Sequence, residues 1–315
     1  MSRFIATDAK RLNVKARIGL TGATNAGKTY TALRIAGGLL TAEGYTDEKG
    51  RPDWSKVAII DTERSRSLFY AENGQFGSFK HVEFAPPYSP LDYIEAVNYV
   101  ESLGIKVCII DSLSHAWNGT GGILDIVTDL TLKSKTKNAY NEGWGGKAGG
   151  TALQNKMIDE ILSSKMHTIC TFRQKMEYVQ EKDEATGKTV IKKLGVKPVQ
   201  RDDLEYEFDI TLKLNDDHTA EIIKNTVDFL GKKETTLPVI TEEFGKLLGE
   251  YLSKGENVEI YKAKIKESLL TDVKTLFDKY PPLVEYYKNT YTQAKVSSLE
   301  IDELRTLIKE LKEMI

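Results

Sequence analysis

Residues 22–29 read Gly-Ala-Thr-Asn-Ala-Gly-Lys-Thr and fit the spacing G-x-x-x-x-G-K-[S/T]. An apolar run over 16–22 precedes them, and apolar residues with helical spacing follow over 27–43. We therefore expect a strand, a tight turn and a helix. The two glycines have no side chain, so backbone amides can approach an anion closely. The motif predicts a loop that binds phosphate groups, because a turn that merely uses glycine has no need of the lysine and threonine.

The side chains after the second glycine indicate which phosphate ligand is expected. Lys28 would reach the β- and γ-phosphates of ATP, and the Thr29 hydroxyl would ligate Mg²⁺. The start of the helix adds free N–H groups and a positive dipole end. We expect ATP and Mg²⁺ as cofactors, bound by Gly22, Ala23, Thr24, Asn25, Ala26, Gly27, Lys28, Thr29 and Tyr30.

Two further apolar runs, 57–61 and 107–111, each end in an aspartate. Parallel strands bring their carboxyl ends to one edge of a sheet, where ligands of α/β proteins bind. Glu63 follows the first run by two residues and is placed to polarise a water, whereas no glutamate follows the second run. We assign Asp111 to the Mg²⁺ shell and Glu63 to the catalytic base. Either aspartate could instead cap a helix, and Asp61 has no other clear role.

Short β-branched runs alternate with helical patterns along most of the chain. The expected strands are 16–22, 56–61, 81–85, 106–111 and 167–172, and the expected helices are 27–43, 90–103 and 151–164. Strands that are apolar throughout and alternate with helices predict an α/β fold with a mostly parallel central sheet. A polar hairpin is expected over 177–193 with its turn at Gly187, and an antiparallel pair over 205–215 and 218–225 at one edge of the sheet.

Only helical patterns remain after about residue 256. We therefore divide the chain into a main domain, 1–254, and a small helical appendage, 255–315. The appendage has nearly balanced charge, which favours helix packing or contact with a partner over binding to nucleic acid.

Composition excludes several other classes of protein. The 44 basic and 46 acidic residues give a net charge of −2, so any attraction to nucleic acid must come from local patches. No run approaches the ~18 apolar residues of a membrane span, and the N-terminus lacks the apolar core of a signal peptide. Cys108 and Cys170 each lie in an apolar run, which indicates buried thiols in a reducing compartment. We expect a cytoplasmic protein.

Taken together, these stretches resemble the RecA-like recombinase core. A closer resemblance is to phage-encoded RecA-like ATPases, including the fourth group of Sak single-strand annealing proteins. It is carried by GATNAGKTYTALRIA, IIDTERS, VCIIDSLSHAWNGTGGILDIV, KMEYV and GVKPVQRDDLEYEFDITLKLNDDHTA, roughly within residues 17–225. The resemblance implies a RecA-like P-loop NTPase core and a phage protein in the bacterial host cell.

The resemblance also implies roles for residues outside the motif. Gln174 in TFRQ looks like the family's glutamine that senses the γ-phosphate, although it could be an ordinary solvated side chain. The family binds ATP between protomers of a ring or filament, and Lys197 and Arg201 are candidates for a basic residue acting in trans. Arg201 could equally pair with Asp202 or Glu205 of its own chain. The chain lacks the bacterial recombinase's long N-terminal polymerisation helix and glycine-rich DNA loop.

RecA-like cores hold single-stranded DNA on loops that follow the strands ending near Asp111 and Gln174. Here 130–150 has four lysines against one glutamate, and 185–201 has five basic residues and no acid. Basic residues track phosphates and exposed aromatic rings stack on bases, but such lysines could also be merely solvated and Trp144 could pack in the core. The expected DNA-binding residues are Lys133, Lys135, Lys137, Tyr140, Trp144, Lys147, Lys188, Lys192 and Lys193.

These inferences converge on an Mg²⁺-dependent, DNA-stimulated ATPase that binds single-stranded DNA and supports phage recombination or single-strand annealing. One alternative is a ring helicase or translocase, and another is a nucleotide-gated adaptor that works through its C-terminal helices without DNA. The expected partners are single-stranded DNA, further copies of the chain and, at the C-terminal helices, a single-strand-binding or other replication protein. No membrane partner is expected.

Overall fold

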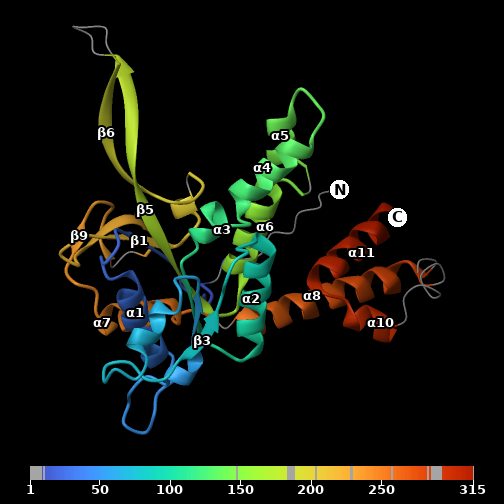
Figure 1. The fold of residues 1–315 in the computed structure, drawn as a ribbon. Coiled ribbons are helices and arrows are strands. Elements are labelled where there is room, and N and C mark those ends of the chain that lie inside the picture. The colour runs from blue at the N-terminus through green and yellow to red at the C-terminus, as the bar shows by residue number, and fades with distance from the viewer. Residues whose placement is uncertain are drawn as a thin grey trace. The chain divides into compact units, whose positions relative to one another are not determined.

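A computed structural model (Figure 1) describes residues 9, 11–146, 148–182, 189–202, 204–227, 230–256, 258–281, 284 and 293–314. Residues 176–182, 189–196, 258–259 and 293–294 are described by their backbone alone. The chain forms two compact units, which are described separately below. One unit is Lys15–Tyr251, and the other comprises Met1–Val14 with Leu252–Ile315.

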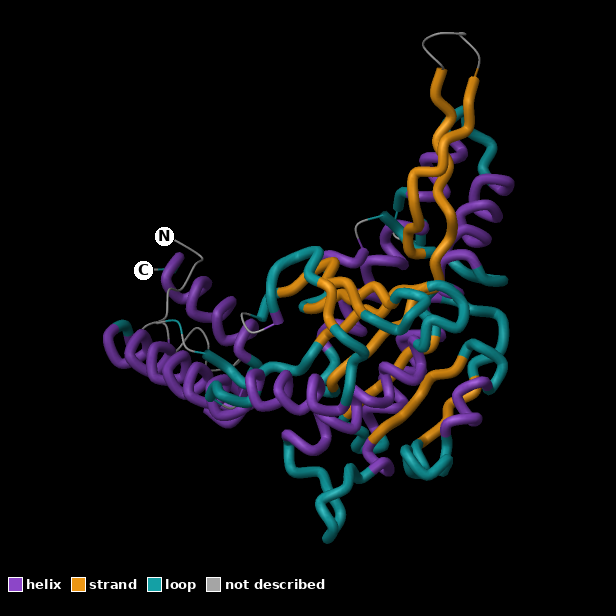
Figure 2. The backbone as a smooth tube through the Cα atoms, turned by 90° about the vertical axis from the view of Figure 1, so that its left-hand side faces the viewer, coloured by secondary structure: helices purple, strands orange, loops and turns teal. Residues whose placement is uncertain are grey.

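The larger unit is built on a sheet whose strands are drawn in orange in Figure 2. Among the described residues the sheet has nine strands, and its path runs β3-β2-β4-β5-β1-β7-β8-β9, with β6 paired to β5. The strands are β1 Arg17–Gly22, β2 Val57–Asp61, β3 Lys80–Glu83, β4 Val107–Asp111, β5 His167–Lys182, β6 Thr189–Pro198, β7 Ile210–Leu214, β8 Ala220–Asn225 and β9 Thr236–Leu237. Neighbouring strands from β3 to β7 are parallel. The pairs β7–β8, β8–β9 and β5–β6 are antiparallel. This confirms the expected α/β fold, with a mostly parallel sheet and antiparallel strands at one edge.

Most helices of the larger unit occupy connections between the parallel strands, and the last one follows the edge strand β9. They are α1 Lys28–Ala42, α2 Pro90–Ser102, α3 His115–Asn118, α4 Ile123–Lys133, α5 Ala139–Trp144, α6 Gly150–Ser163 and α7 Glu242–Leu252. Three 3-10 helices, η1 Trp54–Lys56, η2 Arg66–Tyr70 and η3 Leu204–Tyr206, complete the connections. Helix α2 begins as its sequence predicts, because the Ser89 side chain accepts from the backbone N–H of Asp92 and a proline follows at the first helical position.

The neighbouring strands β2 and β4 are buried along their whole length, as expected of parallel strands covered on both faces. On one face, Ile60 and Ile110 pack in a cluster with Tyr93 of α2 and Met157 of α6. Side chains alternate between the faces of a strand, so the neighbouring residue Ile109 points to the opposite face, where α1 packs. The sheet therefore holds the carboxyl ends of its strands rigidly at one edge.

Helix α7 packs against α1 so closely that its contact residues must be small. A Cβ added to Gly245 would lie 2.2 Å from the backbone oxygen of Ile35, and one added to Gly38 would lie 2.0 Å from the oxygen of Glu242. Arg34 strengthens this contact with two hydrogen bonds, at 2.7 and 3.0 Å, to Glu242.

Substituting Gly245 with alanine should therefore force α1 and α7 apart. We expect the free energy of unfolding to fall by about 3 kcal/mol, as overpacking of a well-filled contact does. Chemical denaturation of the full chain measures the change. Leu247→Ala, at a position 45% exposed on the same helix, is the control and should lose less than half as much. Equal stability of Gly245→Ala and wild type would contradict the described packing.

Three expectations about secondary structure need correction. The strand expected at 167–172 continues to Lys182, because its distal half leaves the sheet and pairs with β6 alone. The strand expected at 205–215 begins only at Ile210, because a 3-10 turn occupies Leu204–Tyr206. The stretch 130–150 is not one long loop: it contains the end of α4, all of α5 and the start of α6, with Gly143 and Gly150 buried. Gly187 lies outside the described residues.

The smaller unit contains α8 Val258–Lys279, α10 Gln293–Ser298 and α11 Ile301–Glu313. Its core consists of Leu269, Val273, Val296, Leu304, Leu307, Ile308 and Leu311. Helix α11 begins with a capping box, in which Glu300 and Glu303 each accept from the other's backbone N–H. Among the described residues of the whole chain, no helix is long and apolar enough to cross a membrane.

Candidate functional site

The turn between β1 and α1 has the backbone that the glycine motif predicts. Gly27 has a φ of 87°, in the left-handed region that glycine adopts without strain. A Cβ added to Gly22 would lie 3.0 Å from the backbone oxygen of Leu214 and 3.1 Å from Ala26 Cβ, so this position also favours glycine. The Lys28 ammonium donates to the carbonyls of Gly22, at 3.0 Å, and Ala23, at 2.8 Å. Burial lowers the pKa of Lys28.

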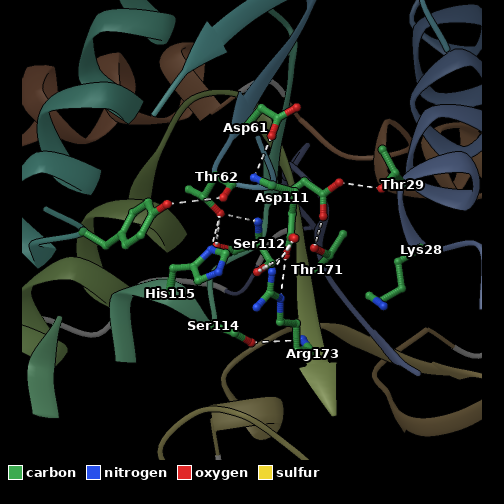
Figure 3. Close-up of polar contacts among 12 residues, drawn as sticks. Lys28, Thr29, Asp61, Thr62, Asp111, Ser112, Ser114, His115, Thr171 and Arg173 are labelled. Atoms are coloured by element: carbon green, nitrogen blue, oxygen red, sulfur yellow. Dashed lines mark hydrogen bonds and ion pairs between the residues drawn. The ribbon is translucent and has the colours of Figure 1, made fainter. Parts of the chain in front are cut away.

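Asp111 lies at the end of β4 and meets the first turn of α1 (Figure 3). The Thr29 hydroxyl donates to Asp111 Oδ2 at 2.5 Å, and Thr171 of β5 donates to Asp111 Oδ1. Burial raises the pKa of Asp111, and these two hydrogen bonds to the carboxylate oppose that rise. Thr29 and Asp111 thus present adjacent oxygen atoms, the ligand type that Mg²⁺ prefers. The donor set therefore fits the expected metal.

Asp61 caps the turn that follows β2. Its Oδ1 accepts from the backbone N–H of Glu63 at 2.7 Å, and its Oδ2 accepts from the N–H and hydroxyl of Ser67 at 3.0 and 2.6 Å. The side chain is almost fully buried. These contacts give Asp61 the capping role that the sequence left open, and they fix the segment that carries Glu63.

Glu63 forms an ion pair with Arg173, a residue that sequence reasoning did not select. Arg173 Nε donates to Glu63 Oε1 at 2.7 Å and its Nη2 donates to Oε2. Ser112 adds a hydrogen bond of 3.1 Å to Oε1. Burial alone would raise the pKa of Glu63, but Arg173 outweighs it and the pKa is lowered. Arg173 pairs with Gly22 in the register of β1 and β5. The sequence signal that could have identified Arg173 is its position directly after the apolar run 167–172.

A buried polar cluster connects β2 to β4 behind this pair. Thr62 Oγ1 accepts from the backbone N–H of Ser112 at 2.8 Å and contacts His115 Nδ1 at 2.7 Å. The ring of Tyr88 stacks on His115 with centroids 4.7 Å apart. None of these residues was predicted, because the sequence does not show which side chains after two separate strands will meet.

One large cavity, with a volume of about 980 Å³, brings most of the predicted site together. Its lining is Gly22, Thr24, Asn25, Gly27, Lys28, Thr29, Tyr30, Thr31, Glu63, Arg66, Phe69, Tyr70, Asp111, Arg173, Gln174, His218 and Val239. Of the predicted nucleotide-binding residues, only Ala23 and Ala26 are outside this lining. Three separate segments of the chain thus place a lysine, a hydroxyl and two carboxylates around one space.

The two candidates for action in trans lie elsewhere. Lys197 forms an ion pair of 3.2 Å with Asp202. Arg201 is exposed and donates to Asn155 Oδ1 at 2.7 Å, so its described hydrogen-bond partner is not one of the two acids considered from the sequence. Neither residue lines the large cavity. Their role in an assembly stays a prediction.

The candidate DNA-binding residues divide between exposed and packed positions. Lys133, Lys135 and Lys137 are exposed at the end of α4 and in the turn after it, and Tyr140 of α5 is 65% exposed. Trp144 is half-buried, with its ring 5.7 Å from that of Trp117, which favours the packing alternative. Lys147 and Lys188 lie outside the described residues, as do the side chains of Lys192 and Lys193 on β6.

Comparison with known proteins agrees with this geometry. A family model described as an AAA domain matches residues 14–236, which is more than half of the chain and includes the glycine motif, Glu63, Asp111 and Arg173. No curated protein matches the chain at a significant level.

Proposed function

The chain belongs to the AAA domain family and is a P-loop ATPase, and from this premise we propose that it hydrolyses ATP with Mg²⁺ in the large cavity. The observation that carries the proposal is the contact between Thr29 and Asp111, 2.5 Å apart at the cavity wall beside Lys28. A hydroxyl from the phosphate-binding loop and a carboxylate from another strand meet there, and these two oxygen ligands would hold Mg²⁺ beside the phosphates.

The residues of the cavity have distinct tasks in this proposal. The amides of 22–29 and the Lys28 ammonium hold the phosphates, and the ammonium must leave the carbonyls of Gly22 and Ala23 to do so. Thr29 and Asp111 would hold Mg²⁺, and the metal would supply charge neutralisation for the phosphates. Phe69, Tyr70 and Val239 supply apolar lining suited to a nucleobase.

Glu63 is the proposed base that orients and deprotonates the attacking water. Both of its oxygens are engaged by Arg173 in the described state, so the ion pair must loosen before Glu63 can accept a proton. Arg173 and Gln174 follow one another on β5 and both line the cavity. A γ-phosphate there would attract Arg173 and thereby release Glu63, which couples nucleotide binding to the readiness of the base.

Thr171 offers a test of the metal site that leaves its two ligands intact. Thr171→Val removes the hydrogen bond that orients Asp111, and loss of such a partner weakens metal affinity by about 10- to 100-fold. We expect the Mg²⁺ concentration that gives half-maximal ATPase activity to rise by that factor. Thr21→Val is the matched control, since Thr21 is a buried strand threonine whose hydroxyl has no partner among the described residues. If Thr171→Val needs the same Mg²⁺ concentration for half-maximal activity as the wild type, Asp111 does not hold the metal.

We further propose that the ATPase binds single-stranded DNA, with the exposed lysines and Tyr140 of the α4–α5 segment as the contact. Self-association and a role in phage recombination or annealing rest on the sequence resemblance described above. DNA-stimulated turnover with strand unwinding would favour the motor alternative. Failure to bind oligonucleotide at low salt, with and without ATP, would favour the adaptor.

The DNA proposal predicts a change in salt dependence. Replacing Lys133, Lys135 and Lys137 together with alanine should weaken oligonucleotide binding and reduce the slope of log affinity against log salt by up to about 2. Fluorescence anisotropy with an oligothymidylate measures both quantities. Lys49→Ala, an exposed lysine in the 46–52 loop, serves as control. If the triple variant and the wild type have the same slope, the α4–α5 segment does not contact the DNA.

A further inference from the structure

A second cavity, of about 440 Å³, lies against the Glu63–Arg173 pair. Its walls come from the turn after β2, the connection between β3 and α2, the segment from α3 to residue 120, and β5. Glu63, Arg66 and Arg173 line both this cavity and the large one. The ion pair of Glu63 with Arg173 therefore separates the two cavities and lines both of them. The large cavity is assigned to the nucleotide, and the second cavity has no assigned role so far.

The lining of the second cavity carries an excess of positive charge. Arg64, Arg66 and Arg173 supply three guanidinium groups. Among the described residues of the lining, Glu63 is the only carboxylate, and both of its oxygens accept hydrogen bonds from Arg173. Arg64 and Arg66 are exposed, and the described part of the chain offers neither of them a carboxylate within 4.0 Å. Burial and the charge of Arg173 lower the pKa of His115, in keeping with a positive potential in this space.

The turn that presents the two arginines is held in an unusual conformation. Arg64 and Ser65 have φ values of 58° and 59°, in the left-handed region that residues with a side chain rarely adopt. The buried carboxylate of Asp61 fixes both ends of this turn, through the N–H of Glu63 and the N–H and hydroxyl of Ser67. Backbone strain that the surroundings maintain in this way is concentrated at binding sites.

We propose that the second cavity binds a phosphate group, and that the cationic partners of this group are the guanidinium groups of Arg64, Arg66 and Arg173 that line the cavity. A guanidinium group pairs with phosphate oxygens through two parallel hydrogen bonds, so an occupant would compete with Glu63 for Arg173. Its regulatory consequence, release of the base, rests on the function proposed above, but the binding site itself does not. The phosphate could be free orthophosphate, such as the product of hydrolysis, or a phosphodiester of single-stranded DNA.

Calorimetric titration of the full chain with orthophosphate tests the proposal, with the large cavity filled by a non-hydrolysable ATP analogue and Mg²⁺. We expect one further site, weakened about tenfold or more in Arg64→Gln, since a hydrogen bond between charged partners is lost. Arg64 lines only the second cavity and is exposed, so this variant should fold and bind the analogue as wild type does. Arg51→Gln, in the 46–52 loop, is the matched control.

A parallel titration with an oligothymidylate distinguishes the sources of the phosphate. Weaker binding of orthophosphate alone supports the free ion as occupant, and weaker binding of the oligonucleotide supports the phosphodiester. In either case the NMR signal of the Arg173 Nε–H should shift when the ligand is added. If Arg64→Gln binds both ligands as Arg51→Gln does, the proposal is overturned.

The test is separable from the proposed ATPase mechanism. Should the analogue itself fail to bind, the function proposed for the large cavity is wrong, and the same phosphate titrations in the Lys28→Ala chain still decide whether the second cavity is a site. Conversely, normal binding of the analogue can coincide with unchanged affinities for orthophosphate and oligothymidylate in Arg64→Gln. That result would contradict the phosphate site in the second cavity and would be compatible with the proposed ATPase function.

Discussion

Replacing Lys28 with alanine should lower the affinity for ATP at least about a hundredfold, because two charge-assisted hydrogen bonds to phosphate are lost at about 1.5–3 kcal/mol each. Among the described residues, Lys28 is the only lysine that lines the large cavity, and its ammonium donates to two carbonyls of the loop that would hold the phosphates. Binding of a fluorescent ATP analogue measures the loss.

Lys49→Ala provides the control for removal of one positive charge, because Lys49 is exposed and lies in a loop outside the cavity. Its affinity for the analogue should equal that of the wild type. The Lys28 variant should retain its circular dichroism spectrum and unfolding midpoint, since alanine suits the first turn of a helix. Nucleotide affinity within threefold of wild type in a folded Lys28→Ala protein would contradict the assignment of the phosphate-binding loop.

Substituting Glu63 with glutamine should leave ATP binding nearly intact and reduce the rate of hydrolysis by about 10²- to 10⁴-fold, the usual contribution of a general base. The amide keeps the shape of the side chain but cannot accept a proton. It also weakens the ion pair with Arg173, so the affinity for ATP should rise slightly if Arg173 then turns towards the γ-phosphate. Single-turnover hydrolysis of radiolabelled ATP separates the chemical step from binding.

Glu72→Gln is the matched control for this substitution. Glu72 is an exposed glutamate shortly after η2 and is outside the lining of both cavities. Its hydrolysis rate should be unchanged. A wild-type rate in Glu63→Gln would mean that another group activates the water and that the pairing with Arg173 is purely structural.

The parts of the fold that follow from local sequence were predictable. The glycine motif placed the β1–α1 turn to within one residue, and the runs that end in Asp61 and Asp111 are the neighbouring strands β2 and β4, whose last residues pair in the register. Parallel strands with both faces buried leave a continuous apolar signal, and a carboxylate after such a strand is easy to recognise. The expected meeting of Thr29 with Asp111 depended only on these local features.

The remaining part of the site depends on contacts between distant segments. Arg173 and Thr171 gain their partners because β5 lies between β1 and β4, an order that the sequence does not express. Thr62 and His115 meet only because the segments after β2 and β4 converge. The polar hairpin expected over 177–193 corresponds to the distal half of β5 paired with β6. The sequence did not show that the first strand of this hairpin is continuous with the buried strand expected at 167–172.

Whether the large cavity binds ATP with Mg²⁺ can be measured by calorimetric titration of the full chain with a non-hydrolysable ATP analogue, with and without Mg²⁺. We expect one saturable site for the analogue, and we expect weaker binding when Mg²⁺ is withheld because the metal that Thr29 and Asp111 would hold is then missing. No heat of binding in the presence of Mg²⁺, from a chain shown to be folded, would contradict this expectation.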